Sequence, residues 1–128
     1  MPGNHKGHFL GPTIFNKVNT SMTIAKDEIF GPVLCVLEAK TVDEAIAIAN
    51  SHPFANAASV YTSNGAVARK FAREIDASMV GVNIGVPAPM SYFTFGGNKQ
   101  SFFGDVKAHG KDSVSFYTQN KTSIQRWW

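Results

Sequence analysis

The sequence predicts an α/β fold in which helices pack on a parallel sheet, and three observations support this prediction. Three short apolar runs have the length of strands, and they alternate with two segments of helical periodicity. Each crossover between them is long enough to hold a helix, as a parallel connection requires. The first run is apolar on both faces, which is typical of a strand covered on both sides. The expected order is therefore strand–helix–strand–helix–strand.

The first third of the chain leads from a loop to the first strand of this sheet. Residues 1–10 are rich in turn-forming residues, Pro12–Val18 alternates loosely as a short strand, and Asn19–Glu28 is a polar connection. Pro32–Glu38 is the doubly apolar strand and contains β-branched valines. These features suit a strand inside a parallel sheet.

The first expected helix follows this strand and begins at a capping box. The Thr41 hydroxyl can accept a hydrogen bond from the amide of Glu44, while the Glu44 side chain reaches back. His52–Pro53 ends the helix, because proline cannot continue it. One apolar stripe runs along its length, formed by Val42, Ala45, Ile46 and Ala49.

The second expected helix lies between the strands Ala58–Thr62 and Met79–Ile84. Asn64–Gly65 alone would also fit a hairpin turn. The apolar residues that follow are four apart, which is helical spacing: Val67, Phe71 and Ile75. We therefore expect a helix here, with Ser63 or Asn64 as its N-cap.

The third strand has two different faces. Val80, Val82 and Ile84 form an apolar face, whereas Gly81, Asn83 and Gly85 form a face of small groups. Small groups let another backbone or a ligand come close.

The last third of the chain differs in character. Val86–Gly97 is a loop rich in proline, phenylalanine and glycine, and residues 102–110 have room for one helical turn. Ser113–Gln119 alternates between apolar and polar residues and is expected to be a strand. Trp127 and Trp128 would be exposed on a free monomer, which indicates a contact surface.

The composition indicates a surface that is covered by something else. Only 16% of the 128 residues are charged, against about 25% in ordinary soluble domains. A small domain has proportionally more surface and needs more charge, not less. Ten phenylalanines and 44% hydrophobic residues exclude a disordered chain. The sequence therefore predicts either an obligate oligomer or a piece of a larger chain.

Several function classes are not favoured by the sequence. The net charge is +3 and the basic residues are scattered, so no nucleic-acid partner is expected. No apolar run approaches the roughly 20 residues of a membrane span, and no secretory signal opens the chain. One cysteine excludes a disulfide framework and favours a reducing compartment such as the cytoplasm.

The residues that carry chemistry in other proteins form no catalytic or metal-binding set here. Cys35 lies within a strand, away from basic residues that would activate a thiol, so a structural role is favoured over a nucleophile. His5 and His8 lack a second pair of ligands at zinc spacing, so no metal is expected. No glycine-rich stretch has the spacing of a phosphate-binding loop.

The stretch Glu28-Ile29-Phe30-Gly31-Pro32 resembles the Glu-x-Phe-Gly-Pro motif of the aldehyde dehydrogenase superfamily. The resemblance covers essentially the whole chain in the right order, with further matches at Phe9–Ile14, Asp43–Ala45, Val82–Asn83, Phe95–Lys99 and Phe116–Thr122. Within the superfamily, the chain is similar to the CoA-acylating methylmalonate-semialdehyde dehydrogenases, through Gly81–Asn83, Pro87–Met90, Phe93–Gly97, Ser101–Asp105 and Phe116–Gln119.

The resemblance implies roles for individual residues. Glu28 matches the glutamate that hydrogen-bonds the ribose hydroxyls of the nicotinamide cofactor, and Phe30 matches the aromatic side chain beside that ribose. Phe95 matches an aromatic residue at the substrate entrance, and Phe93 belongs to a loop that lines the same entrance. Asn83 is expected to organise this loop rather than to react.

The resemblance also implies a division of the chain. Residues 1–112 correspond to the C-terminal part of the catalytic domain, a three-layer portion with a parallel sheet in strand–helix–strand–helix–strand order. Residues 113–128 correspond to an oligomerisation strand and tail. The expected contacts with a second copy are Val114, Phe116, Thr118, Trp127 and Trp128.

The implied activity is that of a parent enzyme, an NAD-dependent dehydrogenase that oxidises a small aldehyde and uses CoA as co-substrate. In the family, the nucleophilic cysteine precedes the Glu-x-Phe-Gly-Pro motif, whereas Cys35 follows it. No residue of this chain is therefore assigned as catalytic, and the chain alone is expected to be inactive. The expected location is the cytoplasm, or the mitochondrial matrix in a eukaryote. The alternative is a non-catalytic interaction module that pairs through its C-terminal strand.

Overall fold

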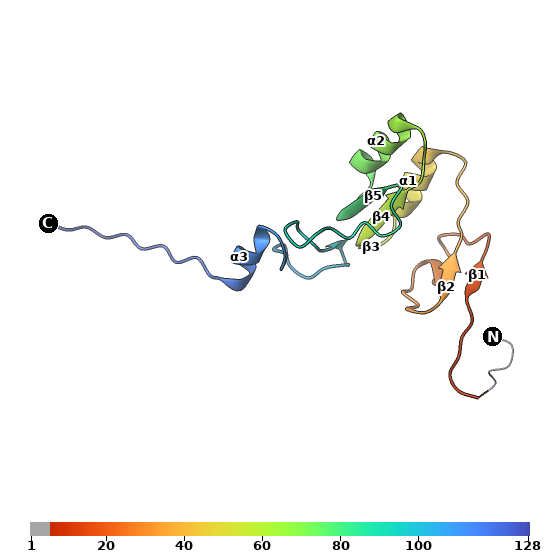
Figure 1. Ribbon diagram of the computed structural model, residues 1–128, viewed down its shortest axis with the longest axis horizontal. Helices are drawn as coiled ribbons and strands as arrows, with labels where there is room; N and C mark the ends of the chain where they lie inside the picture. The colour runs from red at the N-terminus through yellow and green to blue at the C-terminus, as the bar shows by residue number, and fades with distance from the viewer. Residues whose placement is uncertain (1–5) are drawn as a thin grey trace. The chain divides into compact units, whose positions relative to one another are not determined.

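The computed structural model describes residues 6–128, so His5 lies outside the described residues. The chain divides after His52 into two compact units, and each is described by itself. Figure 1 shows their elements.

The first unit contains two parallel strands. β1 (Thr13–Phe15) pairs with β2 (Val33–Cys35), and Ile14 lies opposite Leu34. The 3-10 helix η1 (Thr23–Ala25) lies between them in sequence. Both strands are shorter than the sequence predicts. Lys17 and Phe30 have φ of 55°, and this left-handed backbone cannot continue a strand.

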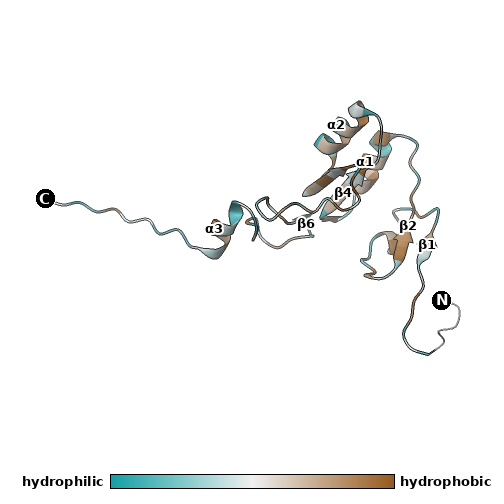
Figure 2. Ribbon diagram, viewed as in Figure 1, coloured by the Kyte–Doolittle hydropathy of each residue, from teal (hydrophilic) through white to brown (hydrophobic). Residues whose placement is uncertain are grey.

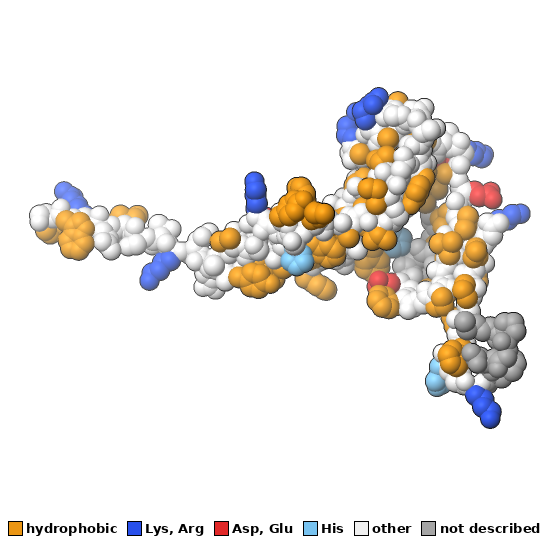
Figure 3. Space-filling view, in the orientation of Figure 1, with side chains coloured by type: hydrophobic (Ala, Val, Ile, Leu, Met, Phe, Trp, Pro, Cys, Tyr) orange, Lys and Arg blue, Asp and Glu red, His pale blue; other side chains and the backbone are white. Residues whose placement is uncertain are grey.

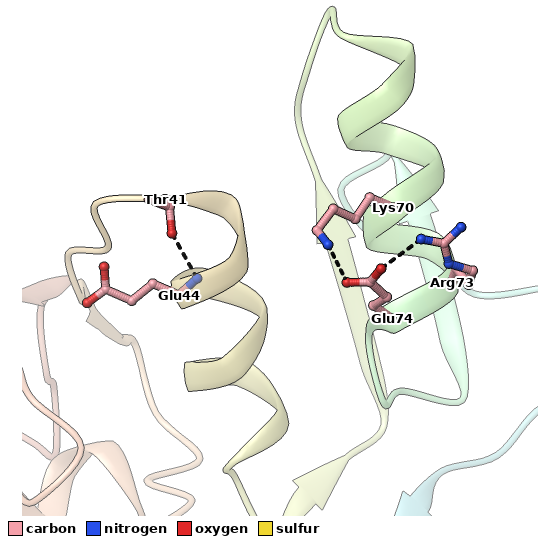
Figure 4. Close-up of polar contacts among 5 residues, drawn as sticks. All are labelled: Thr41, Glu44, Lys70, Arg73 and Glu74. Carbon is pink, nitrogen blue, oxygen red and sulfur yellow. Dashed lines mark hydrogen bonds and ion pairs between the residues drawn. The ribbon is translucent and has the colours of Figure 1, made fainter.

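The first unit also contains α1 (Val42–Asn50), which begins at the predicted cap. The Glu44 amide donates to Thr41 Oγ1 at 3.1 Å, as Figure 4 shows. Glu44 Oε2 accepts from the amide of Lys40 at 2.7 Å, one residue before the cap. The first interaction satisfies an amide that the helix leaves free, and the second ties the Glu44 side chain to the residue before the cap. The prediction of this helix is confirmed.

The second unit contains the predicted parallel crossover. β4 (Ala57–Val60) and β5 (Met79–Val82) are parallel neighbours, and α2 (Gly65–Glu74) connects them. Asn64 Oδ1 accepts from the amides of Ala66 and Val67, so the hairpin alternative is wrong. The strand–helix–strand order with a parallel pair is thus confirmed for this half of the chain.

The last turn of α2 carries a small group of charges. Glu74 accepts from Lys70 and from Arg73, each at 2.8 Å (Figure 4). The hydrogen bond from Lys70, followed by that from Arg73, lowers the pKa of the Glu74 carboxyl below its ordinary value. These contacts therefore stabilise the folded chain when the pH is above the ordinary pKa of a glutamate. The stabilisation is lost as the pH falls through the lowered pKa of Glu74 in the folded chain.

The single sheet that the sequence predicts is not what the described residues form. They form three two-stranded sheets, and one of these was not predicted. In that sheet, β3 (Phe54–Ala55) pairs antiparallel with β6 (Asn98–Lys99). Positive φ at Asn83 and Lys99 ends β5 and β6, as it limits the strands of the first unit.

The predicted strand over Ser113–Gln119 is wrong. Residues 112–117 form a short helix, α3 (Asp112–Tyr117), and extended backbone begins only at Thr118. Alternation over so few residues does not separate a strand from one helical face. Local hydrogen bonds favour the helix, because the Ser113 amide donates to Gly110 O and the Thr118 hydroxyl donates to Val114 O. The helical turn expected within residues 102–110 does not form; that segment contains bends and turns.

Little of the apolar surface is buried. The buried hydrophobic residues of the described chain are Val18, Ile46, Ala55, Ile75 and Met79. β2 and β5 are strongly hydrophobic in Figure 2, and hydrophobic side chains lie on the visible surface in Figure 3. The exposed area is 10510 Å², against about 6,700 Å² for a globular protein of this mass. None of the helices within residues 6–128 is both long and apolar enough to cross a bilayer.

Candidate functional site

The loop before β2 presents the two residues that the sequence connects with a cofactor. Glu28 is exposed and has no hydrogen-bond or ion-pair partner among the described residues. Phe30 is 94% exposed and has a φ of 55°. A bulky side chain is rare in this left-handed region, and such strain often marks a binding site. The loop therefore exposes a carboxylate and an aromatic ring close together in the sequence.

Two side chains anchor the 3-10 helix that leads to this loop. The Cys35 thiol donates to the carbonyl of Ile24 at 3.5 Å. The His52 ring N–H, at Nε2, donates to the carbonyl of Ala25 at 3.0 Å. η1 is thus held by β2 and by the segment after α1. These contacts support the structural role predicted for Cys35, which is half-buried.

In the second unit, Asn83 joins the ends of β4 and β5. Its Oδ1 accepts from the amide of Thr62 at 2.9 Å, and its Nδ2 donates to the carbonyl of Thr62 at 3.1 Å. The side-chain amide thus replaces a further pair of strand hydrogen bonds. It orients the start of the loop that follows, which agrees with the organising role predicted for Asn83.

Gly81 provides the space that this loop needs. A Cβ at Gly81 would lie 2.6 Å from Ser59 Oγ, 3.1 Å from Pro87 Cβ and 3.2 Å from Ile84 O. The loop thus folds back over the small face of β5, as the sequence predicts. Groups of the chain itself, from Ser59, Ile84 and Pro87, take up the space above this glycine.

Phe93 and Phe95 lie on one segment of the second unit. Phe93 is 59% exposed and helps to line an open groove of about 890 Å³, formed by residues 91–94 and 108–113. The Phe95 ring lies 5.8 Å from the ring of His109, which also lines the groove. The structure thus brings these two aromatics to one region, and it brings Glu28 and Phe30 together in the other unit.

The sequence analysis missed His109 and Lys107, which contact the segment that carries Phe95. No local pattern indicates either contact, because each joins residues more than nine positions apart in the chain.

The C-terminal residues expected to contact a second copy are exposed. Val114 and Phe116 lie on α3, while Thr118 begins the extended tail. Trp127 and Trp128 are fully or almost fully exposed, and the Arg126 guanidinium lies 5.1 Å from the Trp128 ring. Within the described part of the chain, no three potential ligands gather as a metal site would require.

Comparison with known proteins identifies the family. The sequence model of the aldehyde dehydrogenase family matches residues 1–123. The chain belongs to the aldehyde dehydrogenase family. Malonate-semialdehyde dehydrogenase 2 of Geobacillus kaustophilus is 58% identical over 121 residues, which cover 94% of this chain and 25% of that protein. The malonate-semialdehyde dehydrogenase of Bacillus subtilis is 56% identical over a stretch of the same length.

Solved structures of the family agree with the described fold. The methylmalonate-semialdehyde dehydrogenase of Oceanimonas doudoroffii has a TM-score of 0.88 and 43% identity, and the match covers 95% of this chain and 25% of that one. An aldehyde dehydrogenase of Mycobacterium tuberculosis, solved with NAD+, has a TM-score of 0.80 and 36% identity over 93% of this chain and 24% of that one. The chain thus spans about a quarter of the length of the family members it matches.

Replacement of Gly81 by alanine tests the packing of the loop over β5. We expect Gly81→Ala to lower the free energy of unfolding of the second unit by about 1–3 kcal/mol, because its Cβ would overlap Ser59 Oγ and press on Pro87 and on the Ile84 carbonyl. The matched control is Gly85→Ala, whose Cβ would meet only the movable Tyr61 hydroxyl, at 3.2 Å. Hydrogen exchange of the β4 and β5 amides measures both effects. Equal costs for the two variants would contradict this account.

Proposed function

We propose that this chain supplies the C-terminal quarter of an NAD-dependent, CoA-acylating semialdehyde dehydrogenase of the malonate and methylmalonate type. The observation that carries the proposal is the Glu28–Phe30 loop. It presents the exposed Glu28 carboxylate, which has no partner among residues 6–128, beside an exposed aromatic ring on a strained backbone. The same activity is supported by the similarity to malonate-semialdehyde dehydrogenases and to a family structure solved with NAD+.

Glu28 would bind the ribose of the nicotinamide half of NAD. A carboxylate accepts hydrogen bonds from two neighbouring hydroxyls at once, and a charged acceptor makes these bonds strong. Phe30 would cover the apolar side of the same sugar. When bound, NAD accepts the hydride from the substrate carbon. The task of this loop is to hold the cofactor still, since no group on it takes part in bond making.

Phe93 and Phe95 would form one wall of the aldehyde entrance. Both rings belong to the segment beside the groove, and neither is buried. Aromatic walls with a few polar groups are typical of small-molecule sites. The Asn83 contact with Thr62 would hold the preceding loop, so that the entrance keeps its shape.

The catalytic groups would come from the parts of the family fold that this chain does not span. The nucleophilic cysteine would form a covalent adduct with the aldehyde carbon, and CoA would later release the acyl group as a thioester. The large apolar surface of this chain would be covered by those other parts. The chain alone would then oxidise no aldehyde.

A chimeric enzyme tests the role of Glu28. We expect this chain to replace the aligned quarter of the Geobacillus kaustophilus enzyme. In that chimera, Glu28→Gln should lower kcat/KM for NAD about tenfold or more, because a charge-assisted hydrogen bond contributes about 1.5–3 kcal/mol. Glu38→Gln, another exposed carboxylate nearby in sequence, is the control. Steady-state NADH formation at varied NAD measures the effect, and equal values for the two variants would exclude the proposed role.

The exposed tail favours a second function, which is association with another copy of the chain. Tail residues 118–128 form no assigned strand, yet they carry Ile124 and both tryptophans on the surface. Val114, Phe116 and Thr118 would extend the same contact. An extended backbone with free edges can pair with a strand of a second chain.

Deletion of residues 119–128 tests this contact. We expect the full chain to form a defined dimer or larger oligomer and the shortened chain to have a lower mass, measured by light scattering behind a sizing column. Trp127→Ser with Trp128→Ser should lower the mass as well. If the full and shortened chains have the same mass per particle, the tail is not the contact.

A further inference from the structure

Two segments of the second unit that are separated in sequence touch at three successive points. At one end, the Gly110 amide donates to Ser91 O at 3.2 Å, and a Cβ on Gly110 would lie 2.7 Å from the carbonyl carbon of Phe93. In the middle, the ring of His109 lies against the ring of Phe95. At the other end, Lys107 contacts Gly96 and Gly97. The two segments therefore run in opposite directions beside each other.

Lys107 contacts the Gly96–Gly97 pair with both its aliphatic stem and its ammonium group. Its aliphatic stem lies against Gly96, where a Cβ would come within 2.7 Å of Lys107 Cδ and 3.0 Å of Lys107 Cε. Its Nζ donates to the carbonyl of Gly97 at 3.1 Å. The same Nζ lies 3.6 Å from the centre of the Phe102 ring, a cation–π contact. One side chain thus joins Gly96, Gly97 and Phe102.

The Lys107 contacts hold the backbone directly after Phe95. Gly96 and Gly97 are buried, whereas Phe95 directly before them is 43% exposed. A glycine pair is the most flexible backbone in the chain unless something holds it. Lys107 holds it on one side, and Ser101 meets Gly97 on the other, where a Cβ would lie 2.5 Å from Ser101 Cβ. The direction of the Phe95 ring then follows from a fixed backbone.

We propose that Lys107 is a positioning residue that fixes Phe95 at the aldehyde entrance through the backbone of Gly96 and Gly97. The proposal rests on the function assigned to Phe95 above. Lys107 touches neither substrate nor cofactor in this account. Its ammonium group provides the donor and the cation, and its stem provides the packing, so only another long cation can replace it.

The first experiment examines the position of the Phe95 ring directly, by NMR spectroscopy of the whole 128-residue chain. We expect the ε-methylene protons of Lys107 to be shifted upfield by the Phe102 ring, and cross-peaks to join the Phe95 and His109 rings. Lys107→Met should weaken these cross-peaks and shift the Gly97 and Asn98 amides, while Lys107→Arg should retain them. Lys40→Met removes a charge from an exposed lysine of the other unit and is the control. An unchanged Phe95 environment in Lys107→Met would overturn the proposal.

The second experiment examines the consequence in the chimeric enzyme described above. Lys107→Met should raise KM for the aldehyde about fivefold to tenfold, the loss expected for one hydrogen bond, with KM for NAD and the melting temperature little changed. Lys107→Arg should restore most of the loss. Gly96→Ala should raise KM for the aldehyde in the same way, because its Cβ displaces the lysine stem.

The two proposals fail in distinguishable ways. A Lys107→Met enzyme with a normal KM for the aldehyde, or one whose KM values for aldehyde and NAD rise together, would overturn the positioning role. A Glu28→Gln enzyme with normal NAD kinetics, beside a clear Lys107 effect, would overturn only the cofactor role of the Glu28 loop.

Discussion

Burial of apolar surface is the interaction on which the rest of this structure depends, and the chain achieves it only in part. The buried hydrophobic side chains of the described residues are few, and aromatic residues such as Phe30 and Phe103 are almost fully exposed. Packing therefore cannot fix the loops that carry Glu28 and Phe95 alone, because a fixed loop needs neighbours on several sides. The low charged fraction agrees with the proposal that other parts cover this surface, since surface that is covered in an assembly needs no charge.

Side-chain hydrogen bonds to the backbone provide much of the missing order. Cys35 and His52 hold the 3-10 helix before Glu28, Asn83 joins the two strands that precede the loop, and Lys107 holds the glycine pair after Phe95. The Cys35 and His52 bonds end on η1, whereas the Asn83 and Lys107 bonds join segments that lie outside the helices and strands. Loops that carry function are usually held in this way on a more rigid scaffold. The strained φ of Phe30 is tolerated because η1 and β2 fix the chain on both sides.

The sequence predicts the local elements well and the long-range ones less well. α1 and α2 follow from their caps at Thr41 and Asn64, and the parallel pair of β4 and β5 follows from the crossover between them. The strand over Ser113–Gln119 was predicted wrongly, because seven alternating residues also fit a helix. The β3–β6 pair and the Lys107 contact could not be predicted, since pairing between distant segments depends on the tertiary fold. The family, by contrast, could be predicted from the sequence, because the Glu28–Pro32 motif and the further matches along the chain are visible without the tertiary fold.

The most direct test of the account compares NAD reduction by the pure 128-residue chain with that by the chimeric enzyme, using malonate semialdehyde and CoA. The account predicts that the chain alone forms no NADH, whereas the chimera forms NADH at a rate within about tenfold of its parent enzyme, as the 58% identity of the exchanged segment suggests. NADH formation by the chain alone would contradict the claim that its catalytic groups lie elsewhere. A folded chimera without activity would contradict the claim that this chain is the quarter that completes the enzyme.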